Sequence, residues 1–526
     1  MLVSDIVRRN AEFFGDRDAT VLPDGSSKTW AGVEDRSSRL ANALLALGLT
    51  KGDRCATFAS NAPEYIEFFF GCAKAGVIGA TTNIRLAPVE LASYLSYVEP
   101  AAILVSADQA DAARRFVDDV ASIRHVIGFG PDHGFDLDYE ELLSAADDLS
   151  QPVTVDDDDT YQLGSTSGTT GVPKGALLTH RNAIAAMLNW LTEFDVAECD
   201  TNLQCIPMFF NPGGPAQLHP VMLKGGRSVI YPGFEPGAFL EAVPRFGVTH
   251  TTAVPTMIGM VLDHPRCGDY DLTTIKAVVT GGSPVPKELL LRARATFGPG
   301  VFRPFFGMAE TYSCGMVLRP ENQRPDGDEI DVRRLSSAGK PHVLMQVRVV
   351  GDDGVDVAAD NETPGELWVR GDTVSPGYFR MDDETAFSRH DGWFKTGDVA
   401  VIDDDGFVSI VDRKKDMIIT GGINVFSREV EDALYAHDAV AQCAVIGVPH
   451  PQWGEAIHAV VVLREGQAAP GVDDLLAFAA GRLASYKKPR SLEIVDELPV
   501  GGTGKVLKRE LRDRYARARG EVDATA

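Results

Sequence analysis

A glycine- and threonine-rich loop is the part of the sequence best suited to chemistry. Residues 165–175 read STSGTTGVPKG. Glycine lets the backbone approach a ligand closely, while hydroxyls and exposed amides can donate to phosphate oxygens and Lys174 adds a positive charge. The spacing is not that of a Walker A loop, because Pro173 stands where the second glycine should precede the lysine. Alone, the loop predicts phosphate binding, with a surface hairpin as the alternative. The residues expected to contact phosphate are Thr166, Ser167, Gly168, Thr169, Thr170, Gly171 and Lys174.

The composition is that of a globular protein with an acidic surface. The chain has 526 residues, a formal net charge of -25 and a pI of about 4.8. Nucleic acids and anionic lipids need a basic footprint, so neither is an expected partner. The acidic run at residues 156–159 is interpreted as a solvated loop and not as a metal site.

Cysteine usage and hydropathy point to the cytoplasm. The seven cysteines form no CxxC pair, which predicts reduced and mostly buried thiols. The N-terminus lacks an apolar signal core. The apolar stretch at residues 68–80 is too short for a membrane span and carries Lys74. We therefore expect a cytoplasmic protein without a membrane span.

The elements that must position the loop alternate between helix and strand. Helical patterns cover residues 37–47, 64–75 and 88–98, and strand patterns cover residues 54–59, 77–82 and 102–106. Such alternation predicts α/β layers with partly parallel sheets.

The predicted secondary-structure pattern changes near residue 339, where short strands separated by turns begin. Strands are expected at residues 347–351, 365–370 and 407–411. A compact α+β pattern follows, with helices expected at residues 428–435 and 472–483 and strands at residues 441–448 and 457–463.

These patterns predict an α/β protein in two parts. The large N-terminal domain comprises residues 1–411, of which 1–338 form layered α/β sheets and 339–411 a β-rich subdomain. A hinge at residues 412–415 leads to a small, mobile α+β domain at residues 416–526.

The loop at residues 165–175 resembles the signature of the adenylate-forming superfamily. This superfamily includes acyl-CoA synthetases, adenylation domains of peptide synthetases and beetle luciferases. The resemblance continues in sequence order through most of the chain, which makes it specific. It implies that ATP, Mg²⁺ and coenzyme A are used by this chain.

Two further motifs resemble the family's adenine site. The sequence TGGSP at residues 280–284 resembles the loop under the adenine ring, and FGMAET at residues 306–311 resembles the aromatic-Gly-x-Thr-Glu motif. The resemblance implies that Phe306 stacks on adenine and that Glu310, with Thr170, binds Mg²⁺. The other implied nucleotide contacts are Gly281, Gly282, Ser283, Gly307, Met308 and Ala309. Two departures stand out: Ala309 replaces a threonine and Phe305 a residue that is usually glycine.

The C-terminal motifs imply the remaining roles. Asp398, in DGWFKTGD, and Arg413, in DRKKD, resemble the ribose-binding residues, since an ionised carboxylate suits two hydroxyl donors. Lys415 occupies the family's hinge position. Gly421 and Gly422 resemble the segment lining the pantetheine tunnel. Ser427 replaces the usual proline before the next helix and is expected to serve as its N-cap.

The Gly-Lys pair at residues 504–505 completes the set. In the family this lysine bridges the carboxylate and α-phosphate oxygens during adenylation, so Lys505 is implied to be catalytic together with Lys174 and Glu310. The implied reaction makes an acyl-adenylate and then an acyl-CoA thioester, with release of pyrophosphate and AMP.

The expected acid pocket is almost uncharged, which favours an aliphatic or aromatic monocarboxylic acid. Its expected lining residues are Phe209, Phe210, Gly213, Val254, Met308 and Met316. One alternative is a stand-alone enzyme that loads a carrier-protein thiol. A second is a nucleotide-binding protein without catalysis. The sequence leaves open whether the protein forms a homodimer. It does not specify the chain length of the acid or whether the acid carries an aromatic ring.

Overall fold

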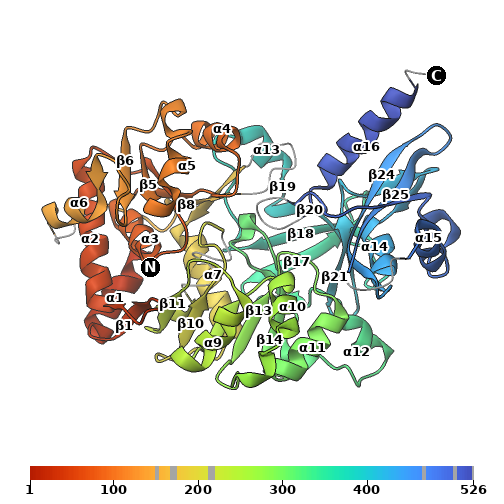
Figure 1. Ribbon diagram of the computed structural model, residues 1–526, viewed down its shortest axis with the longest axis horizontal. Helices are drawn as coiled ribbons and strands as arrows, with labels where there is room; N and C mark the ends of the chain where they lie inside the picture. The colour runs from red at the N-terminus through yellow and green to blue at the C-terminus, as the bar shows by residue number, and fades with distance from the viewer. Residues whose placement is uncertain (148–152, 166–173, 211–219, 465–469, 501–505, 524–526) are drawn as a thin grey trace. The chain divides into compact units, whose positions relative to one another are not determined.

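Two compact units make up the protein. The computed structural model describes residues 1–147, 153–165, 174–210, 220–464, 470–500 and 506–523 (Figure 1). One unit comprises Met1–Val347 and Val369–Phe394, and the other comprises Arg348–Trp368 and Lys395–Ala526. The hinge predicted at residues 412–415 falls within the second unit and stays a prediction.

A nine-stranded sheet forms one layer of the first unit. Its order is β16-β15-β14-β13-β12-β10-β11-β1-β2. The pairs from β14 through β1 are parallel, and the strands at both edges are antiparallel. In chain order the strands are β1 (Asp18–Val21), β2 (Ser27–Thr29), β10 (Thr201–Gln204), β11 (Arg227–Ile230), β12 (His250–Thr252), β13 (Ala277–Thr280), β14 (Phe302–Gly307), β15 (Gly315–Val317) and β16 (Lys340–Pro341).

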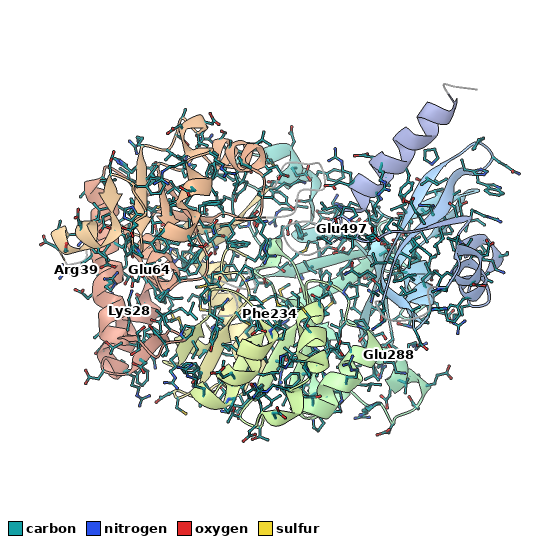
Figure 2. All side chains as sticks on the ribbon, in the orientation of Figure 1. Lys28, Arg39, Glu64, Phe234, Glu288 and Glu497 are labelled. Atoms are coloured by element: carbon teal, nitrogen blue, oxygen red, sulfur yellow. The ribbon has the colours of Figure 1, made fainter. Side chains whose placement is uncertain are left out.

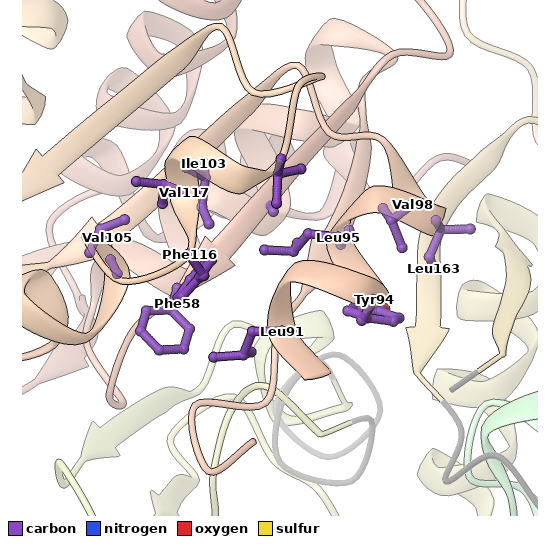
Figure 3. Close-up of a cluster of buried hydrophobic side chains, with 14 of the residues drawn as sticks. Phe58, Leu91, Tyr94, Leu95, Val98, Ile103, Val105, Phe116, Val117 and Leu163 are labelled. Carbon is purple, nitrogen blue, oxygen red and sulfur yellow. The ribbon is translucent and has the colours of Figure 1, made fainter. Parts of the chain in front are cut away.

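A second, seven-stranded sheet lies in the same unit. Its order is β7-β6-β5-β3-β4-β8-β9, parallel except for the last pair. The strands are β3 (Arg54–Phe58), β4 (Ile78–Thr81), β5 (Ala102–Ser106), β6 (His125–Phe129), β7 (Leu137–Asp138), β8 (Thr160–Ser165) and β9 (Gly175–Thr179). Helix α4 (Pro88–Val98) packs on β3 and β5 around Phe58, Leu95 and Ile103 (Figure 3). The expected α/β class is confirmed.

The helices of the first unit follow the expected alternation with one difference. Helix α3 (Glu64–Ala75) and α4 have the predicted bounds, whereas α2 (Trp30–Ala46) begins before residue 37. Thr29 caps α2 by accepting from the Gly32 amide at 3.2 Å. The other α-helices described in this unit are α1 (Ser4–Phe14), α5 (Ala110–Ala113), α6 (Tyr139–Ala145), α7 (His180–Glu193), α9 (Pro236–Phe246), α10 (Pro255–Asp263), α11 (Lys287–Phe297), α12 (Glu329–Arg334) and α13 (Asp382–Phe387).

Two five-stranded sheets complete the fold. The first has the order β17-β18-β20-β19 with β21 on β20, and the second has the order β23-β22-β25-β24 with β26 on β25. The strands are β17 (Met345–Val350), β18 (Gly365–Gly371), β19 (Arg389–His390), β20 (Trp393–Ile402), β21 (Val408–Arg413), β22 (Ile418–Thr420), β23 (Ile423–Val425), β24 (Val440–His450), β25 (Gly454–Leu463) and β26 (Ser491–Ile494). The helices of the second unit are α14 (Ser427–Tyr435), α15 (Val472–Ala480) and α16 (Lys508–Asp523). Among the helices that the structure describes, none has the length and apolar character needed to cross a membrane.

Candidate active site

The expected adenine loop and the expected aromatic motif follow neighbouring strands. β13 and β14 are parallel, with Thr280 opposite Pro304, so Gly281 and Phe305 follow at the same edge of the sheet. A Cβ on Gly281 would lie 2.4 Å from the Phe305 ring, so only glycine fits this contact. Ligands of open α/β sheets bind at the carboxyl ends of strands, which is where this pair lies.

Phe306 and Met308 lie beside this pair and are half-buried. β15 runs antiparallel to β14, and Gly315 leaves room for the Phe306 ring, since a Cβ there would lie 3.2 Å from it. The 3-10 turn η4 (Ala309–Thr311) follows and ends in two non-glycine residues with positive φ, Tyr312 and Ser313. Such backbone strain is characteristic of functional sites. Glu310 belongs to this turn and is 8% exposed.

Tyr378 connects Glu310 with Lys174. Its hydroxyl donates to Oε1 of Glu310 at 2.8 Å. The Lys174 ammonium lies 5.2 Å from the centroid of its ring, within the range of a cation–π interaction. Burial, and next the nearby Glu310 carboxylate, raises the pKa of Tyr378 well above its usual range. The hydroxyl therefore stays protonated and remains a donor.

Two other side chains contact Lys174 and Gly175, the last residues of the expected phosphate loop. The Lys174 ammonium forms an ion pair with Glu384 of α13. The Tyr97 hydroxyl, from α4, accepts a hydrogen bond from the Gly175 amide at 3.4 Å and donates to the carbonyl of Phe379. Sequence reasoning missed Tyr378, Glu384 and Tyr97, because nothing local in the sequence signals contacts between segments so far apart.

The residues expected to line the acid site are apolar where the structure describes them. Phe209 and Met316 are buried, and the Phe209 and Phe210 rings pack edge to face with centroids 4.5 Å apart. Thr81 fixes this turn by donating to the Phe209 carbonyl at 2.8 Å. Val254 is the N-cap residue of α10. The roles of these residues remain predictions.

The second unit brings together Asp398 and Arg413. They are paired across β20 and β21, with the Arg413 Nε atom 3.7 Å from a carboxylate oxygen of Asp398. Lys415 follows two residues later, and burial, then the charge of Arg413, lowers the pKa of its ammonium. These three predicted residues thus form one charged group.

Gly421 and Gly422 form the turn between β22 and β23, both with positive φ. The Gly421 amide donates to the Trp453 carbonyl at 2.9 Å. Ser427, expected to be the N-cap of α14, is instead its first helical residue. Asp412 takes the capping role, because its carboxylate accepts from the Ser427 amide at 2.5 Å and hydroxyl at 2.7 Å.

Several predicted residues lie outside the described part of the chain. They are Thr166, Ser167, Gly168, Thr169, Thr170, Gly171, Gly213 and Lys505. Their roles stay predictions, as do those of the described site residues.

Comparisons with known proteins agree on one family. Residues 7–379 match the AMP-binding enzyme family, and residues 429–505 match the AMP-binding enzyme C-terminal domain. A feruloyl-CoA synthase from Amycolatopsis sp. is 38% identical over 493 residues, 93% of this chain and 94% of the relative. A fatty acid–[acyl-carrier-protein] ligase from Streptomyces coeruleorubidus is 32% identical, over 94% of this chain and 93% of the relative.

A solved structure shows the same fold. The O-succinylbenzoate coenzyme A synthetase from Bacillus subtilis, in complex with ATP and magnesium ion, superimposes with a TM-score of 0.83 at 28% identity, covering 97% of this chain and 98% of that one. The chain therefore belongs to the AMP-binding enzymes, the adenylate-forming superfamily, and to its acyl-CoA synthetase type. It is an enzyme of the AMP-forming acid–thiol ligase class.

Proposed function

We propose that this enzyme uses ATP to convert an apolar aliphatic or aromatic monocarboxylic acid into its CoA thioester, releasing AMP and pyrophosphate. The observation that carries the proposal is the pairing of Lys174 and Glu310 through Tyr378. A cation and a carboxylate at one point suit a nucleotide phosphate and its metal ion.

The residues present fit Mg²⁺. This ion takes one or two carboxylates and completes its shell with water and substrate phosphates. Glu310 supplies a buried carboxylate, and Thr170 is the second expected ligand. Within the described residues no group of three or more His, Cys, Asp or Glu is placed to hold a metal without a substrate. When bound, Mg²⁺ would neutralise phosphate charge.

The chain's own groups account for the first half-reaction. Asp398 and Arg413 bind the ribose, and Phe306 stacks on the adenine. An oxygen of the acid attacks the α-phosphorus, and the bond from that phosphorus to the pyrophosphate oxygen breaks. Lys505 stabilises the negative charge that grows on the α-phosphate oxygens.

In the second half-reaction the small domain turns about Lys415, which removes Lys505 and presents Gly421 and Gly422 to the pantetheine arm. The CoA sulfur attacks the acyl carbon, and the bond to AMP breaks. No side-chain nucleophile is needed, so the catalytic contribution is mainly positioning and charge neutralisation.

The apolar character of Phe209, Phe210, Val254 and Met316 supports the choice of acid, because a second charge buried there would be costly. The feruloyl-CoA synthase relative acts on an aromatic acid by its name, and the carrier-protein ligase on a fatty acid. All seven cysteines are free thiols, which supports a cytoplasmic location.

A panel of acids tests the function. Short, medium and long aliphatic acids, benzoates and cinnamates are incubated with ATP, Mg²⁺ and CoA, and AMP and acyl-CoA are measured. At least one apolar monocarboxylic acid is expected to give both products in equal amounts. Adenylation without a CoA thioester would contradict the choice of acceptor.

Transfer to a carrier protein is the second candidate, and the relative from Streptomyces coeruleorubidus favours it. Phosphopantetheinylated carrier protein in place of CoA tests it directly. Acid-dependent exchange of pyrophosphate into ATP separates both ligases from a nucleotide-binding protein without catalysis, which would show none.

A further inference from the structure

Tyr378 contacts both charged groups of the candidate site through different parts of one side chain. Its hydroxyl hydrogen-bonds to Glu310 at 2.8 Å, and its ring lies 5.2 Å from the Lys174 ammonium. Tyr378 and Glu310 are each 8% exposed. A buried tyrosine with a polar tip and an apolar ring can hold two unlike groups in a fixed relation.

The backbone around Tyr378 is tied to the same two segments. The Phe379 amide donates to the carbonyl of Gly175, the residue that follows Lys174, at 2.8 Å. The Ser375 amide donates to the Glu310 carbonyl at 2.7 Å. Tyr378 therefore cannot move independently of either group, and its side chain links two segments that its own strand of backbone already joins.

The two interactions differ in what they fix. The hydroxyl is a donor directed at one carboxylate oxygen, so it sets the orientation of Glu310. The ring attracts a cation without hydrogen-bond directionality, so it restrains the position of the ammonium. Lys174 also pairs with Glu384, which leaves the ring as its second restraint.

We propose that Tyr378 is a positioning residue, which orients Glu310 for the metal ion and restrains Lys174 for the phosphates before ATP binds. This rests on the proposed function, since it assumes that Glu310 and Lys174 meet Mg²⁺ and ATP. Pre-organised groups lose less freedom on binding, so the affinity for Mg²⁺ and the affinity for ATP should both depend on Tyr378.

Two variants separate the two contacts. Tyr378→Phe keeps the ring and removes the hydroxyl, whereas Tyr378→Leu removes both. The dissociation constant for ATP is measured by calorimetry, once with excess Mg²⁺ and once with EDTA. The constant in EDTA divided by the constant in Mg²⁺ is the Mg²⁺ ratio, which reports how much Mg²⁺ contributes to ATP binding. Tyr378→Phe should reduce that ratio roughly three- to tenfold, as expected for one lost hydrogen bond, without changing the affinity in EDTA. Tyr378→Leu should also weaken binding in EDTA.

A buried tyrosine elsewhere provides the matched control. The Tyr139 hydroxyl donates to the Glu67 carboxylate at 2.7 Å, and Tyr139 is also buried. Tyr139→Phe should leave the Mg²⁺ ratio unchanged. An equal drop of the Mg²⁺ ratio in Tyr378→Phe and Tyr139→Phe would mean general destabilisation and would overturn the proposal.

A double-mutant cycle tests the route through Glu310. In the Glu310→Gln background, Tyr378→Phe should cause no further loss of the Mg²⁺ ratio. A further loss in the double variant contradicts the inference, and so does an unchanged Mg²⁺ ratio in Tyr378→Phe alone. In either case the proposed function stands as long as the wild-type chain binds ATP with Mg²⁺. If the wild-type chain binds no ATP with Mg²⁺, both fail together.

Discussion

At the scale of single residues, Phe305 is the departure from the family pattern with the clearest structural consequence. Its ring covers the backbone of Gly281 and packs edge to face on Trp190, with centroids 5.2 Å apart. The ring occupies a position where the family usually has no side chain. Since Met308 and Met316, close to Phe305 in the chain, are expected to line the acid site, we expect Phe305 to limit the size of the acid.

Replacing Phe305 by Ala should therefore widen the range of acids. The ratio of kcat/KM for a long or bulky acid to that for a short one should rise about tenfold or more, because a buried ring can be worth that in discrimination. The variant should also lose about 3 kcal/mol of stability. Steady-state kinetics on a homologous series of acids give the ratio.

Phe297→Ala is the control for Phe305, since Phe297 is also buried and belongs to α11. It should lower stability without altering the ratio. If the ratio of the Phe305 variant equals that of the wild type while the fold is kept, Phe305 does not limit the acid.

The residues around Phe305 also show which parts of the candidate site could be predicted from the sequence. Gly281, Phe306 and Glu310 belong to contiguous motifs, so their presence at one sheet edge could be anticipated. Tyr378 and Glu384 could not, because their partner Lys174 is distant in the chain, and Tyr378 lies in an isolated β-bridge, which has no periodicity in the sequence.

At the scale of elements, a buried carboxylate joins four of them. Glu67 on α3 is fully buried and accepts from Lys28 at 2.6 Å, Arg36 at 2.8 Å and Tyr139 at 2.7 Å. These partners come from β2, α2 and α6. A charge in such a place is stable only because each oxygen is paired. Glu64, one turn earlier, reaches Lys28 at 3.3 Å. Both residues are labelled in Figure 2.

Glu67→Gln should destabilise the protein by about 3–5 kcal/mol, because Lys28 and Arg36 lose their shared negative charge in a buried place. Glu64→Gln is the matched control and should cost at most about 1 kcal/mol, as for more exposed pairs. Denaturant unfolding followed by circular dichroism measures both. Equal midpoints for the two variants would contradict the central role given to Glu67.

The same region shows why element bounds were only partly predictable. α3 and α4 have clear starts and apolar faces, and their bounds agree with the sequence pattern. The first two turns of α2 carry Glu34 and Arg36, whose pairing with Lys74 and Glu67 of α3 hides the helical period. Tertiary contacts therefore decided that start.

At the scale of the whole molecule, buried histidines couple the fold to pH. Burial lowers the pKa of His180 to about 4 and that of His342 to about 3, and it also lowers that of His250. His180 accepts from the Val3 amide at 3.2 Å, which requires an unprotonated ring nitrogen. Each ring thus stays neutral in the folded chain.

The free energy of unfolding should therefore fall as the pH drops from about 6.5 to about 4. In that range unfolded histidines bind protons, with an ordinary pKa near 6.5, while the folded His180 and His342 do not. At about 1.4 kcal/mol per pKa unit, His180 alone should contribute about 3 kcal/mol of this loss. Denaturant midpoints measured across the range by fluorescence give the slope.

His342→Phe tests the origin of this slope. The His342 ring packs edge to face on Trp190 with centroids 4.8 Å apart, so a phenyl ring can replace it while removing the proton site. The variant should lose less stability than the wild type between pH 6.5 and 4. His390→Gln, at an exposed position, should keep the wild-type slope. If the slope of the His342 variant matches the wild type, the acid sensitivity belongs to other groups, and neutral burial of this histidine does not govern it.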